Sequence, residues 1–305
     1  MTGNAALLRF PRAESGAYVQ HYRCEIASGK ETVATVYRLD CGFLFPPPET
    51  LTLPISGLEE GKTYTVSIIP VTAWANEGEP LVYTFSTLAA EQPLTPEESL
   101  LFSAQFGEGG TAIDAVSGTA LTPTGNPVTS YDEAQGKYIA VFDGSSAFTY
   151  AGIEDSYPVL FDSFTFDTYV RIDEVPTAKY VNHFSNQESG GFGFEYYTHK
   201  KMDFFISVGG TYYSANVILE PGTWVRLTAT YDGKTLILYR NGEKASETSV
   251  SGTITAPKVH YLAIGADSGP GACEDYCVCA VGLADVYRTA LTAEQVQTIY
   301  EAYQH

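Results

Sequence analysis

The sequence predicts an all-β protein made of two domains. It holds 22 Tyr and 16 Phe, and its 28 Gly and 16 Pro divide it into short segments. Aromatic residues favour strands, whereas Gly and Pro favour turns. A length of 305 residues is long for one β-domain and sufficient for two, and a hydrophobic content of 44% excludes a disordered chain.

The charge of the chain excludes two classes of partner. Asp and Glu number 36 against 17 Lys and Arg, which gives a net charge of −19. Nucleic acids and polybasic membrane contacts both need a basic surface. No apolar run approaches the ~20 residues that span a bilayer, and the N-terminus lacks the basic region of a signal peptide. We expect no nucleic-acid partner and no membrane insertion, in a chain that is either cytosolic or part of a longer precursor.

The first domain, residues 1–88, is predicted to be a sandwich of short strands. Residues 28–30 form a turn between two long strands, and the prolines at 46–48 exclude a central strand because they donate no ladder hydrogen bond. The expected strands are 5–10, 17–26, 31–39, 51–53, 64–71 and 81–87. Residues 89–98, with two prolines and three acids, are predicted to be a semi-rigid linker.

The second domain, residues 99–305, is predicted to be almost entirely β. Residues 163–172 alternate apolar and polar side chains, which is the period of a half-buried strand. Further strands are expected at 139–142, 193–199, 202–208, 212–219, 224–231, 235–240, 259–265 and 277–287. Asp232-Gly233 and Asn241-Gly242 favour tight hairpin turns. Thr292 is a candidate N-cap, and residues 293–303 show the period of a helix.

The first domain resembles a fibronectin type III domain. Leu58 stands six residues before Tyr64, with Gly61 in the turn between them, as in the tyrosine corner of that family. The resemblance implies that the Tyr64 phenol oxygen bonds back to the loop backbone. It also implies a first strand ahead of Leu8, where only about seven residues are available, so that strand is expected to be truncated.

The second domain resembles the laminin-G-like, concanavalin A-like jelly-roll family. Segments 140–144, 164–166, 222–233, 238–242 and 282–296 carry the resemblance in the family's order. Tandems of these two domains resemble the C-terminal accessory regions of large secreted bacterial enzymes, among them calcineurin-like phosphoesterases and glycosidases. Such folds host many functions, so function has to be argued from a site.

No catalytic constellation is visible in the sequence. Jelly-roll glycosidases need two carboxylates close together on one strand, and no such run occurs here. Asp167 has no acidic partner two residues away, and Glu274 and Asp275 point to opposite faces of any strand. The chain is therefore predicted not to be an enzyme. Hydrolysis in its own right would require a cleft with two carboxylates within reach.

The five cysteines leave several states open. Cys273, Cys277 and Cys279 are compatible with free thiols, with one disulfide from Cys273, or with zinc, although the Cys-x-x-Cys spacing is absent. In the first domain, a hairpin about Gly29 places Cys24 opposite residue 35. No direct bridge from Cys24 to Cys41 is therefore expected.

Calcium, as a structural ion, is the cofactor that the jelly-roll resemblance implies. It binds six to eight oxygens, often backbone carbonyls with one or two carboxylates. Members of the family often place it on the convex side, with ligands from the first and last strands. The matching positions are Glu108 and Asp285, and Asp143 beside Gly144 is a third candidate. The alternative is that Asp143 and Asp285 only cap turns or accept backbone hydrogen bonds.

The candidate ligand-binding residues alternate with the predicted core residues on two strands. On one strand, the residues that face away from the core are Asp167, Tyr169 and Arg171; on another, they are Glu195, Tyr197 and His199. We expect these side chains to share one sheet face, and take Asp167, Tyr169, Arg171, Tyr197 and His199 as the site. Aromatic platforms edged by charged groups suit a glycan. The alternative is a solvated or domain-packed face.

These features predict a non-catalytic accessory region of a larger secreted bacterial protein. Its jelly roll is expected to bind glycan or cell-surface polymer, and the upstream catalytic domain of the same chain is the second expected partner. The alternative is a purely structural spacer or packing module attached to an upstream hydrolase. The region itself is expected to be a monomer, secreted or at the cell surface.

Overall fold

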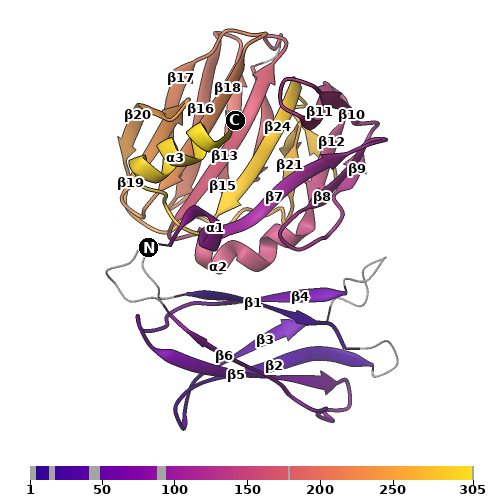
Figure 1. Ribbon diagram of the computed structural model, residues 1–305, viewed down its shortest axis with the longest axis vertical. Helices are drawn as coiled ribbons and strands as arrows, with labels where there is room; N and C mark the ends of the chain where they lie inside the picture. Colours follow the sequence, from indigo (N-terminus) through magenta and orange to yellow (C-terminus); the bar gives the residue numbers. More distant parts are fainter. Residues whose placement is uncertain (1–4, 14–17, 41–48, 88–93, 178, 304–305) are drawn as a thin grey trace. The chain divides into compact units, whose positions relative to one another are not determined.

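The computed structural model divides the chain into two compact units, residues 1–94 and 95–305. It describes residues 5–13, 18–40, 49–87, 94–177 and 179–303 (Figure 1). Cys41, the prolines at 46–48 and residues 89–93 of the predicted linker lie outside these ranges. None of the described helices is long and apolar enough to cross a membrane.

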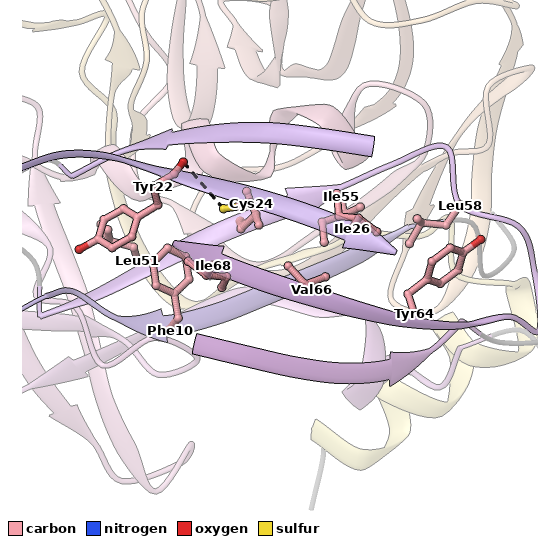
Figure 2. Packing of buried hydrophobic residues seen from close by; sticks show 11 residues of the cluster. Phe10, Tyr22, Cys24, Ile26, Leu51, Ile55, Leu58, Tyr64, Val66 and Ile68 are labelled. Atoms are coloured by element: carbon pink, nitrogen blue, oxygen red, sulfur yellow. Dashed lines mark hydrogen bonds between the residues drawn. The ribbon is translucent and has the colours of Figure 1, made fainter. Parts of the chain in front are cut away.

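The first unit packs two antiparallel sheets against each other. One pairs β1 with β4, and the other has the order β3-β2-β5-β6. The strands are β1 Ala6–Pro11, β2 Val19–Ser28, β3 Glu31–Leu39, β4 Thr50–Ile55, β5 Thr63–Thr72 and β6 Leu81–Ser86. Figure 2 shows Phe10 and Leu51 of the smaller sheet in one core with Tyr22, Val66 and Ile68 of the larger sheet. Alternate residues of β2 and β5 are buried, because successive side chains point to opposite faces.

Two local features of the first unit answer expectations from the sequence. The backbone N–H of Glu59 donates to the phenol oxygen of Tyr64 over 2.8 Å, as the tyrosine-corner pattern implies. In the β2–β3 hairpin, Cys24 faces Val36 rather than residue 35. The shift of one residue comes from an irregularity between Ile26 and Ala27, since a β-bulge places two residues opposite one.

The second unit contains two large sheets. Sheet I has the order β10-β11-β24-β13-β18-β19-β20, with β7 paired to β24 and β8 paired to β7. Its strands are β7 Leu100–Gly107, β8 Thr111–Asp114, β10 Val128–Asp132, β11 Lys137–Asp143, β13 Phe164–Ile172, β18 Trp224–Tyr231, β19 Thr235–Arg240, β20 Glu243–Ser249 and β24 Val278–Tyr287.

Sheet II has the order β17-β16-β15-β14-β21-β12-β9. Its strands are β9 Thr122–Thr124, β12 Ala147–Tyr150, β14 Tyr180–Gln187, β15 Gly191–Tyr197, β16 Lys201–Val208, β17 Thr211–Ile218 and β21 Leu262–Ile264. The short strands β22 Asp267–Ser268 and β23 Cys273–Glu274 form a separate pair. The all-β fold predicted from the sequence is confirmed.

Helical segments are short. They are α1 Pro96–Ser99, the 3₁₀ segment η1 Ala151–Ser156, α2 Tyr157–Leu160 and α3 Ala293–Tyr303. The C-terminal helix occupies the predicted residues. In contrast, the end of the predicted linker is helical: Thr95 accepts from the N–H of Glu98, and the Glu98 carboxylate accepts from the N–H of Thr95. This reciprocal pair of bonds is a capping box, which starts a helix.

An aromatic core fills the space between sheets I and II. Phe164 and Phe166 of β13 contact Phe184, Phe192 and Phe204 of sheet II, with ring centroids 4.9–5.8 Å apart. All five side chains are fully buried. Because the phenylalanines face inward, the residues that alternate with them face outward on both sheets.

Helix α3 lies on the outer face of sheet I (Figure 1). Beneath it, Asp167 of β13 and Arg226 of β18 form a buried ion pair. The Arg226 Nη1 donates to the carbonyl of Ile299 in the helix over 2.5 Å, and the Tyr303 ring lies 4.9 Å from that of Tyr169. A buried charge is tolerated when it is paired and hydrogen-bonded, and here the pair also anchors the helix.

Asp285 of β24 is a further buried acid close to this ion pair, and lies directly opposite Asp167 in the sheet. Burial raises the pKa of Asp285 from 3.8 to about 7, and the negative charge of Asp167 adds to the effect. A hydrogen bond from Ser103 and the positive charges of Arg226 and Lys137 oppose the rise. Asp285 therefore holds its proton over a pH range in which an exposed aspartate has lost it.

Replacing Tyr64→Phe removes the acceptor of the Glu59 N–H. Because this leaves a part-buried donor without its partner, we expect the first unit to lose about 1–2 kcal/mol of unfolding free energy. Urea denaturation followed by circular dichroism measures the change. Tyr37→Phe, at an exposed position on β3, is the matched control and should change stability by less than ~0.5 kcal/mol. Equal effects of the two substitutions would contradict the tyrosine-corner bond.

Replacing Asp285→Asn should change how stability depends on pH. Between about pH 4 and pH 7 the folded state keeps the Asp285 proton while the unfolded chain releases it, so this group's contribution to stability falls as pH rises. The Asp285→Asn variant has no carboxyl group at this position, so its stability does not show this fall with rising pH. Its stability relative to the parent should therefore rise across that window, by up to about 4 kcal/mol.

Urea titrations that follow Trp224 fluorescence in a Trp74→Phe background measure this difference, because the chain has only two Trp. Asp143→Asn is the control. The pKa of Asp143 is lowered by hydrogen bonds from Ser145 and Ser146, so its ionisation is complete in both states over the upper part of the window. A constant difference between Asp285→Asn and the parent would rule out the raised pKa.

Candidate functional site

The predicted ligand-binding residues do not form one face. Asp167, Tyr169 and Arg171 belong to β13 of sheet I, whereas Tyr197 ends β15 of sheet II and His199 follows it. The two outer faces lie on opposite sides of the aromatic core. The expectation of one shared face is therefore wrong. Alternation along a strand shows which residues point away from the core, but not which sheet the strand joins.

The sheet I members of the predicted set are engaged within the protein. Asp167 is fully buried and accepts hydrogen bonds from Arg226 and Thr228. Tyr169 stacks on Trp224, with centroids 4.8 Å apart, and also contacts Tyr303 of α3. These contacts fix α3 on the sheet.

Arg171 is also held by its own neighbours. It donates to Asp173 over 2.6 Å and lies over the Trp224 ring at 5.3 Å. These contacts keep its guanidinium near the C-terminal end of β13, on the far side of the core from Tyr197.

The outer face of sheet II carries a row of polar side chains across four neighbouring strands. Asn182 of β14 pairs with Glu195 of β15, Glu195 with Asp203 of β16, and Asp203 with Asn216 of β17. Directly paired residues share a face, with Cβ atoms ~4.5–5.5 Å apart. We call these four residues the polar row.

Aromatic and basic side chains flank the polar row on one side. Tyr180 and Tyr197 are paired across β14 and β15, with ring centroids 5.7 Å apart. The Lys201 Nζ lies 4.9 Å above the Tyr197 ring, and the exposed His199 ring is 5.5 Å from the same tyrosine. Tyr197 and His199 are thus the two predicted residues that this face brings together.

The polar row is only partly satisfied. Glu195 accepts from the Tyr197 hydroxyl over 2.5 Å, and the Asp203 Oδ2 accepts from the Lys201 Nζ over 2.9 Å. In the described part of the chain, however, the Asp203 Oδ1 and both amide atoms of Asn182 are buried without a hydrogen-bond partner. Buried polar atoms are nearly always paired with protein, water or ligand, so these atoms have hydrogen-bonding capacity that no described residue uses.

The face is acidic, and its acids repel one another. Asp267 lies beside the polar row, because it accepts a hydrogen bond from Ser185 of β14, which is on the same face. Burial, with the charges of Asp275 and Glu195, raises the pKa of Asp267 to about 7. Burial also raises the pKa of Glu195, and the charge of Asp203 contributes. Each acid therefore gains from a positive charge or a hydrogen-bond donor placed beside it.

The predicted calcium ligands do not fit one ion. Asp143 pairs with Val278 on β24, seven residues from Asp285, which corresponds to about 23 Å along a strand. Glu108 lies just beyond β7, five residues past Ser103, the β7 partner of Asp285. Over the described ranges, no group of three or more His, Cys, Asp or Glu side chains is arranged to hold a metal.

Two of these acids have other contacts. The Asp143 Oδ1 accepts from the N–H of Ser145 and from the hydroxyls of Ser145 and Ser146, and so caps a turn. Asp285 is buried beside Asp167. Calcium as a structural ion stays a prediction of the family resemblance. Cys24, Cys273, Cys277 and Cys279 are buried free thiols.

The polar row is the part of the site that sequence reasoning missed. Its carboxylates lie eight residues apart, so a search for acids on a single strand passes over them. The signal was nevertheless present, because a turn centred on His199 places residue 195 opposite residue 203. A hairpin register applied to that turn predicts the Glu195–Asp203 pair.

Solved structures with a similar fold are receptor-binding proteins. The binding domain of botulinum neurotoxin DC in complex with SialylT superposes with a TM-score of 0.55 at 14% identity, covering 68% of this chain and 52% of that one. The binding domain of Paraclostridial Mosquitocidal Protein 1 gives 0.53 at 14%, covering 68% and 53%. A botulinum neurotoxin type C structure, whose title describes cell entry dependent on two ganglioside molecules, gives 0.53 at 14%, covering 68% and 52%.

These likenesses show the fold alone, because the identities are low. The chain spans about half the length of each neighbour. No curated protein matches the sequence. A family model described as the concanavalin A-like lectin/glucanases superfamily matches residues 143–297, which hold most of sheets I and II. Because that match covers half of the sequence, this chain belongs to the concanavalin A-like lectin/glucanases superfamily.

Proposed function

We propose that the second unit binds carbohydrate without cleaving it, through the outer face of sheet II. The observation that carries the proposal is the polar row beside the Tyr180–Tyr197 pair. Sugar sites combine an aromatic ring, which contacts the apolar face of a pyranose, with polar groups that bind its hydroxyls. Asn182 and Asp203 supply such groups with hydrogen-bonding capacity still unused.

The comparisons support this choice of ligand class. Titles of two structures with the same fold refer to SialylT and to gangliosides. Those ligands belong to the neighbours, and this chain covers about half of each of them. The local support is therefore the geometry of the face itself: two tyrosines, two amides and two carboxylates on four adjacent strands.

We also propose that the chain is an accessory region of a longer secreted bacterial protein, with the first unit as a fibronectin type III-like spacer. The strand order β1-β4 against β3-β2-β5-β6 and the Tyr64 hydrogen bond support the likeness of the first unit to that family. In this proposal, the region is a monomer. Its jelly roll binds a polymer and so keeps an upstream catalytic domain of the same protein close to that polymer.

Glycoside hydrolysis is a second candidate function, favoured by the direct pairing of Glu195 with Asp203. Two carboxylates at such spacing are what a retaining glycosidase uses. In this structure, however, Tyr197 and Lys201 occupy one oxygen of each carboxylate. Release of reducing ends from a bound glycan, lost in Asp203→Asn, would establish hydrolysis in place of binding alone.

Replacing Tyr197→Ala should weaken the recognition of glycans by the purified chain. It removes the ring that lies tilted against Tyr180 and the hydroxyl that donates to Glu195. We expect affinity for any glycan identified on an array to fall at least about tenfold, since loss of a stacking aromatic and a charge-assisted bond together costs more than ~1.4 kcal/mol.

Tyr131→Ala is the matched control, because Tyr131 is an exposed tyrosine on β10 of sheet I. It should leave binding unchanged. If the intact chain binds no glycan on the array, the proposed function fails. If both tyrosine variants lose binding equally, or only Tyr131→Ala does, the assignment to sheet II fails.

A further inference from the structure

The outer face of sheet II has a charge that selects among carbohydrates. Four acidic side chains lie on or beside it: Glu195, Asp203, Asp267 and Asp275. Among the described residues, Lys179 places its ammonium over the Tyr180 ring and Lys201 places its ammonium over the Tyr197 ring. The chain as a whole carries a net charge of −19. An anionic sugar approaching this face is repelled both locally and at long range.

A cation already occupies the place where a ligand would sit. The Lys201 ammonium lies 2.9 Å from the Asp203 Oδ2 and 4.9 Å above the Tyr197 ring. A carboxylate beside an aromatic face is an arrangement that attracts ammonium groups. Lys201 is partly exposed, so its side chain can move aside into solvent and vacate this position.

A second, independent observation shows that Lys201 does not complete the site. Asn182 has no exposed surface and Asp203 only 5%, yet both amide atoms of Asn182 and the Asp203 Oδ1 have no partner among the described residues. Through Glu195 the register places both side chains in the polar row. The missing partner of Asp203 Oδ1 is a donor, since a carboxylate can only accept.

We propose that the polar row binds the protonated amine of an amino sugar whose nitrogen carries no acetyl group. The ammonium displaces Lys201 and donates to Asp203 and Glu195, while Asn182 pairs with neighbouring hydroxyls. Tyr180 and Tyr197 contact the pyranose ring. This inference rests on the proposed function and narrows its ligand to cationic glycans, in contrast to the sialylated ligand named for one structural neighbour.

The test compares two probes that differ only in acetylation. Glucosamine hexamer and N-acetylglucosamine hexamer are titrated into the full chain by calorimetry at about pH 7, where ordinary amines are protonated, ordinary carboxylates are ionised and Asp267 is about half ionised. We expect the glucosamine hexamer to bind at least about tenfold more tightly, because a charged hydrogen bond replaces a neutral one. Added salt should weaken its binding, because screening reduces the long-range attraction between a cationic glycan and the acidic chain.

Two substitutions are expected to change the affinity for glucosamine hexamer in opposite directions. Asp203→Asn should weaken glucosamine hexamer binding at least about tenfold, whereas Lys201→Ala should strengthen it by about two- to fivefold by removing a competing cation. Glu133→Gln removes one exposed negative charge between β10 and β11 and should change nothing. If Asp203→Asn fails to fold by circular dichroism, the sign of the Lys201→Ala effect still decides.

The alternatives give distinct results. Equal or tighter binding of N-acetylglucosamine hexamer, or binding of sialyllactose that Lys201→Ala weakens, overturns the cationic ligand and leaves glycan binding standing. An oligolysine of equal charge that binds as tightly as glucosamine hexamer shows that the face recognises charge alone, and overturns the sugar. If neither hexamer binds but other glycans on the array do, this inference fails by itself. A wholly negative array removes the proposed function as well.

Discussion

The aromatic core between sheets I and II is the constraint on which the site depends. Phe164 and Phe166 on one side and Phe184, Phe192 and Phe204 on the other must all point inward to escape water. Side chains alternate along a strand, so the core also decides what points out. Glu195, Asp203 and Asn182 are outward because their neighbours are buried. A change of one residue in register would exchange the two sets.

The outer faces of sheets I and II make different contacts with the rest of the second unit. On sheet I, Arg226 pairs with Asp167 and donates a hydrogen bond to the Ile299 carbonyl in α3. The Tyr303 ring of the same helix lies over the Arg226 guanidinium. Both carboxylate oxygens of Asp167 accept hydrogen bonds there. Among the described residues, the Oδ1 atoms of Asp285 on sheet I and of Asp203 on sheet II both lack a hydrogen-bond partner. On sheet II, burial with neighbouring negative charges also raises the pKa of Asp267 and of Glu195. The same kind of buried carboxylate thus stabilises a helix on one face and leaves capacity for a ligand on the other.

Local patterns in the sequence predicted the elements well, and long-range pairing explains what they could not predict. The alternation at 163–172 and the helical period at 293–303 gave the correct strand and helix. The tyrosine-corner spacing predicted the contact of Tyr64 with its loop. In contrast, the division of β13 and β15 between two sheets leaves no trace in either strand. Residues 171 and 197 look equivalent by alternation, yet a core separates them. Glu195 and Asp203 come together only through a hairpin register, and Asn182 through a neighbouring strand.

We propose that ligand binds to the outer face of sheet II. The most direct measurement is an amide NMR titration of the whole chain with a glycan that it binds. If the ligand binds to the outer face of sheet II, chemical-shift changes will concentrate at Asn182, Glu195, Asp203 and the strands that carry them. Changes concentrated instead on β13, β18 and α3, or in the first unit, would contradict it.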